Sequence, residues 1–435
     1  MTDGHALARR CLRAGIDAAH PETVVRDRLS LDGGTLTIAG RAYDLDSYER
    51  VVVVGGGNAA GTVATELESL LCDRIDTGVV VTDLPTATER IEQVEGAHPR
   101  PNETAVAGTD RVRELLAAAD AQTLVLAVVT GGASALLPAP AGDLSLADLR
   151  ATTDELLASG ASIGEMNAVR KHLSATKGGR LASVAAPATV ATLLFSDVVG
   201  DDASVIGSGP FTPDDTTYGD ALAVADRYTL DLPTAAVDHL RAGRDGEHTE
   251  TPDADAPAFE RVTEHLLASN HTAARAALDV ARAAGYEPLL LSTRIRGEAR
   301  EAAKSAVAVG EEIAATGNPV EPPAVLVTGG ETTVTVRTDS PGTGGPNTEY
   351  ALSAALELDT SGVVVAALDT DGIDGNGSLA GASVDGSTVA PENRRRAQRA
   401  LDSHDAATYL GGCDAAIDTG ATGTNVNDLR VVVVE

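Results

Sequence analysis

The sequence contains no tryptophan, and its three phenylalanines and seven tyrosines bring the aromatic share to only 2% of the chain. Basic residues are also scarce, because 33 Lys and Arg stand against 64 Asp and Glu and leave a formal net charge of −31. Nucleic-acid binding needs a basic surface and, for single strands, aromatic side chains on which bases stack. The composition therefore excludes nucleic acid as a partner.

The few cations are mostly arginine, since lysine occurs only at Lys171, Lys177 and Lys304. An acidic excess of this size is larger than solubility alone requires. It resembles adaptation to high intracellular salt, where charges on the surface are strongly screened. We expect an extremely halophilic source.

Cysteine is rare, and Cys11, Cys72 and Cys413 are far apart and odd in number. This spacing predicts neither disulfide bonds nor a zinc site. No apolar run approaches the roughly 20 residues of a membrane-spanning helix. The N-terminus also lacks the basic and then apolar segments of a secretory signal. We expect no membrane association and a cytoplasmic location.

The chain does contain alternating apolar strands and amphipathic helices over 435 residues, which predicts an α/β protein of two domains. Residues 241–258 interrupt the periodicity with prolines, glycines and charges, and this is the best boundary between the halves. We therefore place the domains at residues 1–245 and 246–435.

Residues 51–61 are typical of a buried strand, a glycine turn and the start of a helix. Asp83 follows the next predicted strand, where dinucleotide-binding folds place an acidic residue for the ribose. The glycine fingerprint is incomplete, with Gly55, Gly57 and Ala60 in its three positions. The stretch leaves dinucleotide binding open beside phosphate binding of another kind.

Two predicted strands end in a Thr-Gly-Gly turn: residues 130–134 follow the strand at 124–129, and residues 328–332 follow the strand at 324–327. Backbone N–H groups exposed by consecutive glycines form an anion-binding nest. Each turn alone is also typical of a tight structural turn. Their recurrence predicts two similar α/β halves that face a shared cleft.

Residues 160–180 form a basic stretch in this acidic chain, with Lys171 and Lys177 beside Arg170. Asn167 lies three and four residues before Arg170 and Lys171, so a helix would place these side chains on one face. The stretch predicts an anion site. The alternative is a solvated helix end, because cations near a C-terminus favour the helix macrodipole without any ligand.

Carboxylates follow two predicted strands: Asp197 comes after residues 189–195, and Asp371 and Asp374 come after residues 363–368. Open α/β sheets bind ligands at these strand ends, and Mg²⁺ prefers a few carboxylates, waters and phosphates. The sequence predicts a magnesium site here. In an acid-rich chain, solvated loops are the alternative.

Taken in order, these motifs resemble those of the class II glycerate 2-kinases, whose C-terminal part is called the MOFRL domain. The matching segments cover nearly the whole chain: residues 96–102, 130–136, 167–174, 177–182, 196–201, 297–300, 329–332, 370–375 and 424–428. The resemblance implies an α/β fold with an N-terminal Rossmann-like parallel sheet, a C-terminal MOFRL-type α/β domain and an interdomain cleft. It also implies ATP- and Mg²⁺-dependent phosphorylation of the 2-hydroxyl of D-glycerate. Because the chain has no Gly-x-x-x-x-Gly-Lys-Ser/Thr motif, ATP would be held by a different kind of site.

The resemblance also implies roles for particular residues. Arg170, Lys171 and Asp197 are expected at the reacting groups, and Asp197, Asp371 and Asp374 are expected as metal ligands or base. The residues expected to bind substrate or phosphate are Asn58, Gly131, Gly132, Ser134, Asn167, Lys177, Arg180, Arg294, Gly329, Gly330, Glu331, Asn347 and Glu349.

Two positions depart from the family pattern: Asn58 stands where a lysine is usual, and Pro346 stands where the family motif has an arginine. Losing one preorganised charge contact costs on the order of 100- to 1000-fold in rate. The sequence therefore leaves open a kinase for another small hydroxy or sugar acid, a hydroxypyruvate-type reductase using a nicotinamide cofactor, and a non-catalytic ligand-binding paralogue. It also leaves open whether the chain forms a homodimer.

Overall fold

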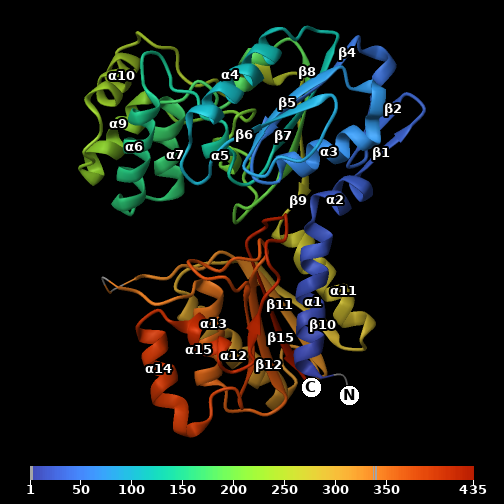
Figure 1. Ribbon diagram of the computed structural model, residues 1–435, viewed down its shortest axis with the longest axis vertical. Helices are drawn as coiled ribbons and strands as arrows, with labels where there is room; N and C mark the ends of the chain where they lie inside the picture. The colour runs from blue at the N-terminus through green and yellow to red at the C-terminus, as the bar shows by residue number, and fades with distance from the viewer. Residues whose placement is uncertain (1–2, 337, 339) are drawn as a thin grey trace. The chain divides into compact units, whose positions relative to one another are not determined.

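The computed structural model describes residues 3–336, 338 and 340–435, and the chain divides into two compact units (Figure 1). The N-terminal unit comprises residues 24–196 and 201–267. The C-terminal unit comprises the chain up to residue 23, residues 197–200 and the chain from residue 268 onward. Each unit is built around its own six-stranded sheet.

The sheet of the N-terminal unit follows the nucleotide-binding strand order. Its strands are β4 (Arg50–Gly56), β5 (Thr77–Thr82), β6 (Ile91–Glu95), β7 (Thr123–Val129), β8 (Thr189–Phe195) and β9 (Val262–Ala268). They lie in the order β6-β5-β4-β7-β8-β9, and the pairs from β6 to β8 are parallel. The chain therefore crosses from one side of β4 to the other between β6 and β7. Open α/β sheets bind their ligands beside such a crossing, at the carboxyl ends of the strands.

The strands at the centre of this sheet form because their sequences are near-continuous runs of Val and Leu. β7 is buried along its whole length, and β4 and β8 are buried at every position but the first. Such runs are typical of parallel strands that are covered on both faces. A separate antiparallel sheet contains β1 (Leu29–Asp32), β2 (Thr35–Ile38) and β3 (Arg41–Asp44).

Helices surround this sheet and also form a layer of their own (Figure 1). The helices of the N-terminal part are α2 (Pro21–Arg28), α3 (Ala60–Leu71), α4 (Glu103–Ala117), α5 (Ala133–Leu136), α6 (Leu146–Ser159), α7 (Ile163–His172), α8 (Arg180–Ala185), α9 (Tyr218–Tyr228) and α10 (Thr234–Arg244). Residues of α6, α7, α9 and α10 share one apolar cluster that contains Leu156, Val169, Tyr218 and Leu240. This cluster fixes the basic helix α7 against its neighbours.

The C-terminal unit has a mixed sheet. Its strands are β10 (Glu287–Ile295), β11 (Ala324–Gly330), β12 (Val363–Asp369), β13 (Gly381–Asp385), β14 (Ala416–Ile417) and β15 (Asp428–Val434). They lie in the order β10-β11-β15-β12-β13-β14. Only β10 and β11 pair in parallel; the other pairs are antiparallel. The last strand of the chain is thus inserted into the middle of the sheet.

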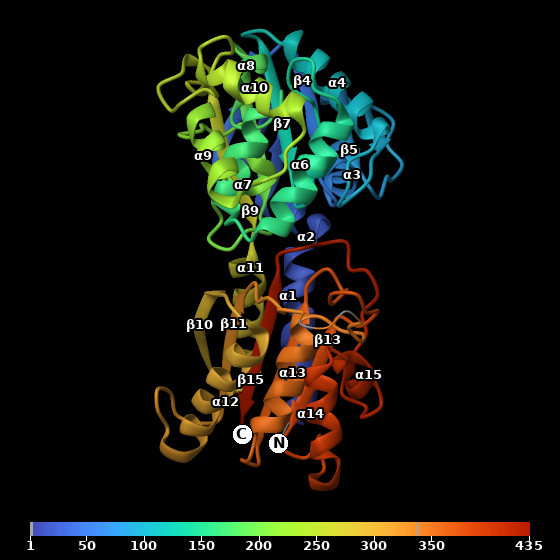
Figure 2. The same cartoon turned by 90° about the vertical axis from the view of Figure 1, so that its left-hand side faces the viewer.

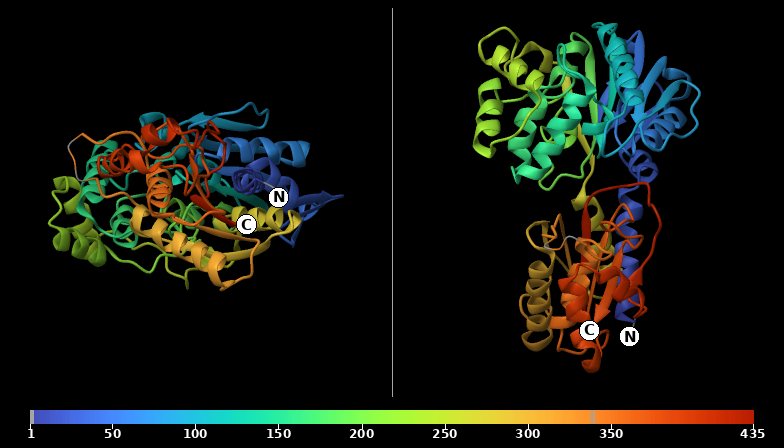
Figure 3. Two further views of the ribbon diagram at one scale, coloured as in Figure 1. Left: turned by 90° about the horizontal axis from the view of Figure 1, so that it is seen from below. Right: turned by 60° about the vertical axis from the view of Figure 1, so that its left-hand side comes forward.

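Apolar clusters cover both faces of this sheet. The helices are α1 (Gly4–Ala19), α11 (Asn270–Ala283), α12 (Ala299–Thr316), α13 (Pro346–Glu357), α14 (Arg394–Asp402) and α15 (Ala406–Gly411). Residues of α1 and α11 share one cluster with β15, and residues of α12 and α13 share the other (Figures 2 and 3). Side chains of β15 alternate between the two clusters, with Val431 in the first and Val432 in the second.

The two units differ from the ranges 1–245 and 246–435 that the sequence suggests. Helix α1 packs against α11 and β15, so the start of the chain belongs to the C-terminal unit. The segment 246–267 stays with the N-terminal unit because β9 adds a strand to its sheet. The interruption of periodicity at 241–258 is a loop inside that unit.

No helix within the described residues is long and apolar enough to cross a membrane.

The packing of α1 on the C-terminal unit can be tested at Gly15. A Cβ at Gly15 would overlap Leu429 of β15 and lie 3.0 Å from the carbonyl oxygen of Ala273 in α11. We expect Gly15→Ala to lower the free energy of unfolding by about 1–3 kcal/mol, the range for overpacked cores. Gly164→Ala is the matched control, because a Cβ on this helical glycine meets open space. Thermal unfolding checks both variants, and equal midpoints would contradict the packing of α1.

Candidate active site

The end of helix α7 and the turn that follows β7 lie together in the N-terminal unit. Asn167 of α7 is buried, and its side-chain oxygen accepts a hydrogen bond of 3.2 Å from Ser208. The Ser208 hydroxyl is 3.0 Å from the Ser134 hydroxyl. The Asn167 side-chain nitrogen is buried and has no hydrogen-bond partner within the described residues. These contacts bring two predicted site residues, Asn167 and Ser134, to the carboxyl end of β7.

Two cations lie beside this group without a neutralising carboxylate. Lys177 is buried, and its Nζ donates to the carbonyl oxygen of Ser134 at 2.6 Å. Burial and the nearby Arg170 guanidinium lower the pKa of Lys177 to about 7. Burial also lowers the pKa of Arg170. Among the described residues no carboxylate pairs with either side chain. Two partly desolvated cations side by side form a site for an anion.

The turn between β7 and α5 adds backbone donors. Within the part of the chain that the structure describes, the N–H groups of Gly131 and Gly132 have no hydrogen-bond partner. Gly132 has φ of 78°, and a Cβ there would overlap the side chain of Asn58. A glycine is therefore required at this position. The turn is an anion nest at the strand end where the sheet order predicts a ligand.

Lys171 is paired with a carboxylate of the protein itself. Its Nζ forms an ion pair with Asp214 at 2.9 Å, and both side chains are buried. Thr216 and Thr251 also donate to the Asp214 carboxylate, so its acceptor positions are filled. The charge of Lys171 is thus already neutralised within the protein, and its expected place at the reacting groups stays a prediction.

Arg180 lies apart from these contacts, at the start of α8. Its Nη2 is 3.4 Å from the Tyr218 hydroxyl and 3.5 Å from the carbonyl oxygen of Thr249. The structure therefore places Arg180 beside an aromatic group, and its proposed role at a phosphate stays a prediction.

The first glycine turn, after β4, is filled by the chain itself. Asn58 N–H donates to the carbonyl oxygen of Gly131 at 2.8 Å, and Ala59 N–H donates to the Thr130 hydroxyl at 3.2 Å. The Asn58 side chain donates to Asp83 at 3.2 Å. Donors that would face a pyrophosphate in a dinucleotide fold are thus used within the protein.

The second Thr-Gly-Gly turn, in the C-terminal unit, is not a nest. Gly329 and Gly330 belong to β11 and pair with Leu429 and Asp428 of β15. The N–H of Glu331 donates to Ile295 at 3.0 Å. Because the strand continues through the glycines, these two residues do not present free donors as their sequence predicts.

Asp197 and Glu331 are two carboxylates of the C-terminal unit that lie close enough for Glu331 to affect the ionisation of Asp197. Burial raises the pKa of Asp197 to about 6, and the nearby Glu331 carboxylate contributes to this rise. Arg294 lies next to the same segment, since a Cβ at Gly200 would be 2.8 Å from its Nη1. The short segment 197–200 therefore gathers one predicted metal ligand, one predicted substrate residue and one predicted cation.

Asp371 and Asp374 do not join Asp197 as a set of metal ligands. Asp374 is buried at the start of α13, where it accepts from the N–H groups of Asn347 at 2.9 Å and Thr348 at 2.7 Å. Asp371 lies close to Asp369 instead, and burial is the main cause that raises its pKa. Among the described residues no three acidic, His or Cys side chains come together as a metal site. Asp374 caps a helix, and the expected roles of Asp197, Asp371 and Asp374 as metal ligands or base stay predictions.

Asn347 and Glu349 are also occupied by structural contacts. The Asn347 side chain donates to Asp428 at 2.6 Å, and Glu349 accepts from Arg300 at 2.8 Å. Glu349 also lies 2.5 Å from the His404 ring. The structure places both predicted residues inside a buried network instead of at a ligand surface.

Sequence reasoning missed the centre of that network. Asp428 is buried and accepts from Arg430, from the N–H of Thr332 at 3.0 Å and from Asn347. The guanidinium of Arg430 lies 4.8 Å from the centre of the Tyr350 ring. The sequence signal for this network is Arg430, a charged residue inside the otherwise apolar strand at 429–434.

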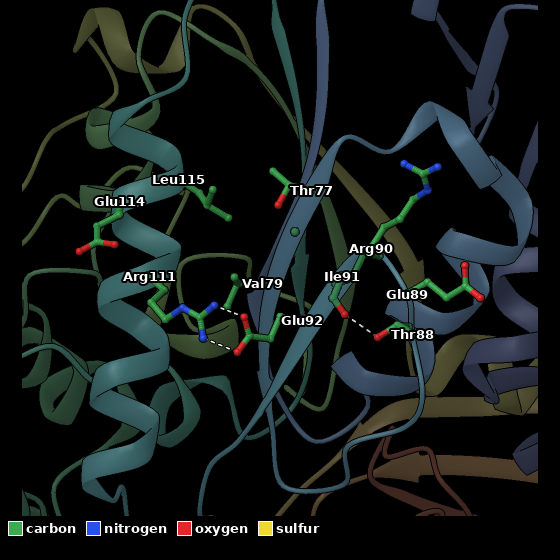
Figure 4. A pocket seen from close by; sticks show the side chains of 11 residues that line it. Thr77, Val79, Thr88, Glu89, Arg90, Ile91, Glu92, Arg111, Glu114 and Leu115 are labelled. Atoms are coloured by element: carbon green, nitrogen blue, oxygen red, sulfur yellow. Dashed lines mark hydrogen bonds and ion pairs between the residues drawn. The ribbon is translucent and has the colours of Figure 1, made fainter.

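A surface cavity of about 540 Å³ lies elsewhere in the N-terminal unit, along β5, β6 and α4 (Figure 4). Arg90, Glu92 and Arg111 are among the residues that line it. Glu92 and Arg111 form an ion pair and neutralise each other. None of the predicted site residues lines it. The cavity is therefore separate from the cations of α7.

Comparison with known proteins agrees with the order of these motifs. A family described as "Domain of unknown function (DUF4147)" matches residues 7–241, and the MOFRL family matches residues 324–428. A "Glycerate 2-kinase" of Pyrococcus horikoshii is 36% identical over 99% of this chain and 98% of its own length. The chain belongs to the glycerate kinase family.

Other members of the glycerate kinase family agree in structure but not in name. The crystal structure of the glycerate kinase of Thermotoga maritima has a TM-score of 0.86 and 33% identity, covering 99% of each chain. A protein of Agrobacterium vitis, provisionally named a hydroxypyruvate reductase, is 41% identical over 88% of this chain and 99% of its own length. The family and the fold are thus shown, and the kinase and reductase names both occur within it.

The buried ion pair predicts a stability effect that an exposed lysine lacks. Lys171→Met would leave Asp214 charged and buried without a cation, so we expect a loss of about 3–5 kcal/mol in the free energy of unfolding. Lys304→Met is the control, since Lys304 forms an exposed pair with Glu301 worth at most about 1 kcal/mol. Denaturant unfolding measures both, and equal losses would contradict a structural role for Lys171.

Proposed function

We propose that the protein is an ATP-dependent kinase that phosphorylates the 2-hydroxyl of D-glycerate. Full-length similarity to proteins named glycerate 2-kinase and glycerate kinase supports this proposal. The observation that carries it is a pair of cations, the half-buried Arg170 and the buried Lys177, beside the free N–H groups of the turn after β7. Phosphoryl transfer requires such positioning and charge neutralisation more than covalent chemistry.

The two kinds of donor suit the two anions of the reaction. The Gly131 and Gly132 N–H groups lie at the carboxyl end of β7, where they would bind phosphate oxygens of ATP. The planar guanidinium of Arg170 can form two parallel hydrogen bonds with the carboxylate of glycerate. Lys177 supplies a point charge between them. The same groups would hold another small hydroxy acid that carries a carboxylate.

Magnesium would be held by Asp197 and Glu331. Both offer carboxylate oxygens, and burial together with the nearby Glu331 carboxylate raises the pKa of Asp197. Mg²⁺ is usually bound by one or two carboxylates together with phosphates of the substrate, so a pair is sufficient. When bound, the ion neutralises charge on the transferred phosphoryl group. The carboxylates of Asp197 and Glu331 would hold the positive charge of the ion beside these two residues.

The structure favours a kinase over a nicotinamide-dependent reductase. A dinucleotide needs free donors at the first glycine turn, and Thr130 and Gly131 occupy those donors here.

Two residues are the reason for considering a non-catalytic paralogue as the alternative. Asn58 and Pro346 stand where the family has cations, and Asn58 contacts an acidic side chain, Asp83.

One assay separates these alternatives. Release of ADP from Mg·ATP is measured with D-glycerate and related hydroxy acids at high salt, and consumption of NADH or NADPH is measured with hydroxypyruvate. The kinase proposal expects ADP release that depends on glycerate. Turnover of the nicotinamide instead would establish the reductase. Saturable binding of ATP or glycerate with no turnover of either kind would establish the non-catalytic paralogue.

Arg170→Gln should separate catalysis from stability. Because no carboxylate of the described chain pairs with Arg170, we expect kcat/KM for glycerate to fall about 100- to 1000-fold while the unfolding midpoint changes little. Lys304→Gln is the control at an exposed cation. A variant that loses stability but keeps its kcat/KM would show that Arg170 is structural.

Lys177 predicts a pH dependence. With its pKa lowered to about 7, Lys177 is charged below that pH and neutral above it. Anion binding therefore weakens as pH rises through this value, and kcat/KM for glycerate should fall on the alkaline side. Lys177→Arg stays charged, so it should lose this alkaline fall. Profiles of kcat/KM for both proteins test the assignment, and an identical alkaline fall in Lys177→Arg would refute it.

A further inference from the structure

Helix α14 lies on the outer side of the C-terminal unit (Figure 2). Its sequence carries an unusual density of positive charge. Arg394, Arg395, Arg396 and Arg399 are all exposed, in a chain whose net charge is −31. Arg396 lies over the Tyr409 ring, at 5.8 Å from its centre. Arg394, Arg395 and Arg399 form no ion pair with any described residue. We call these three residues the arginine face.

Two of the three residues of the arginine face are unfavourably placed for the helix that carries them. Arg394 and Arg395 lie in the first turn of α14, where positive charge opposes the helix macrodipole. The start of α14 also has no side-chain cap. Helices α4, α6, α7 and α9 of the same chain each have an acidic residue in the first turn. Arg399 lies in the last turn, where its charge favours the macrodipole, but the charges of Arg394 and Arg395 do not serve the stability of the helix.

A second surface of the same unit has the opposite charge. Glu311 and Glu312 of α12 lie with Glu357, the last residue of α13, and with Asp359, whose N–H donates to Glu311 at 3.2 Å. We call these four residues the acidic corner. Glu357 also opposes its helix dipole, since it is negative at a C-terminus. No Lys or Arg of the described residues pairs with the acidic corner.

We infer that the arginine face of one molecule binds the acidic corner of a second copy of this chain. Each surface is locally unfavourable, and each supplies the charge that the other lacks. Guanidinium groups pair with carboxylates through two parallel hydrogen bonds, which gives such a contact a defined geometry. At high salt, long-range repulsion between two acidic molecules is screened over about 3 Å, so contact pairs decide association.

A nucleic acid is a poorer fit to the same face. Proteins that bind duplex DNA typically neutralise about 6–10 phosphates. The arginine face has three free cations, without aromatic groups for stacking, on a strongly acidic molecule. A small set of carboxylates matches it better.

Two charge-reversed variants of the protein test the contact, so that the test does not depend on the folding of a single variant. The first carries Arg394→Glu, Arg395→Glu and Arg399→Glu. The second carries Glu312→Arg, Glu357→Arg and Asp359→Arg. Sedimentation velocity at high salt, over a range of concentrations, measures their association. We expect wild type to associate and each variant alone to associate at least about tenfold more weakly. A mixture of the two variants should associate again, because each presents the charge that the other now needs.

Controls distinguish this contact from a general effect of net charge. A protein with Arg10→Glu, Arg28→Glu and Arg275→Glu has the same change in charge at exposed arginines of other helices, and it should associate like wild type. A monomeric wild type, unchanged association in either variant, or a mixture that stays monomeric would overturn the proposal. Binding of the arginine face to duplex DNA instead would also overturn it. ADP release is measured separately, so loss of association and loss of the proposed kinase activity remain distinguishable.

Discussion

The buried ion pair between Lys171 and Asp214 determines how the basic end of α7 can be used. A buried charge is tolerated only when it is paired and hydrogen-bonded, and Asp214 meets this condition with Lys171, Thr216 and Thr251. Gly178 packs against both the Lys171 and Asp214 side chains. The pair therefore fixes the turn that carries Lys177. Arg170, one position before Lys171, is left without a carboxylate and can meet a ligand.

Much of the fold follows from the sequence because the signal is local. The run at 189–195 is mostly apolar and is observed as β8 with the same bounds. The glycine turn after β4 and the basic helix were likewise predictable, since each depends on neighbouring residues. The assignment of α1 to the C-terminal unit was not predictable in this way. It depends on the fit of Gly15 against Leu429 and Ala273, which are distant in sequence.

The candidate site shows the same limit. A basic stretch predicts an anion site, but its sequence does not say which of two adjacent cations is neutralised. Asp214 neutralises Lys171 and leaves Arg170 unpaired, and it lies 43 residues after Lys171 in the sequence. Asp374 was predicted as a metal ligand because it follows a strand. A helix start that needed an acceptor lies beside it, and the N–H groups of Asn347 and Thr348 take both of its oxygens.

Strand β15 has a consequence for the order in which the protein can be made. It is the last strand in sequence, yet it lies between β11 and β12. The sheet of the C-terminal unit therefore cannot close until residues 428–434 have left the ribosome. Helix α1 is made before β15, needs it for its packing and must wait while the residues between them are translated. The N-terminal unit from β1 to β9 contains all of its own strands and can fold during that interval. The C-terminal unit is thus completed only when β15 emerges, by joining two segments that lie far apart in the sequence.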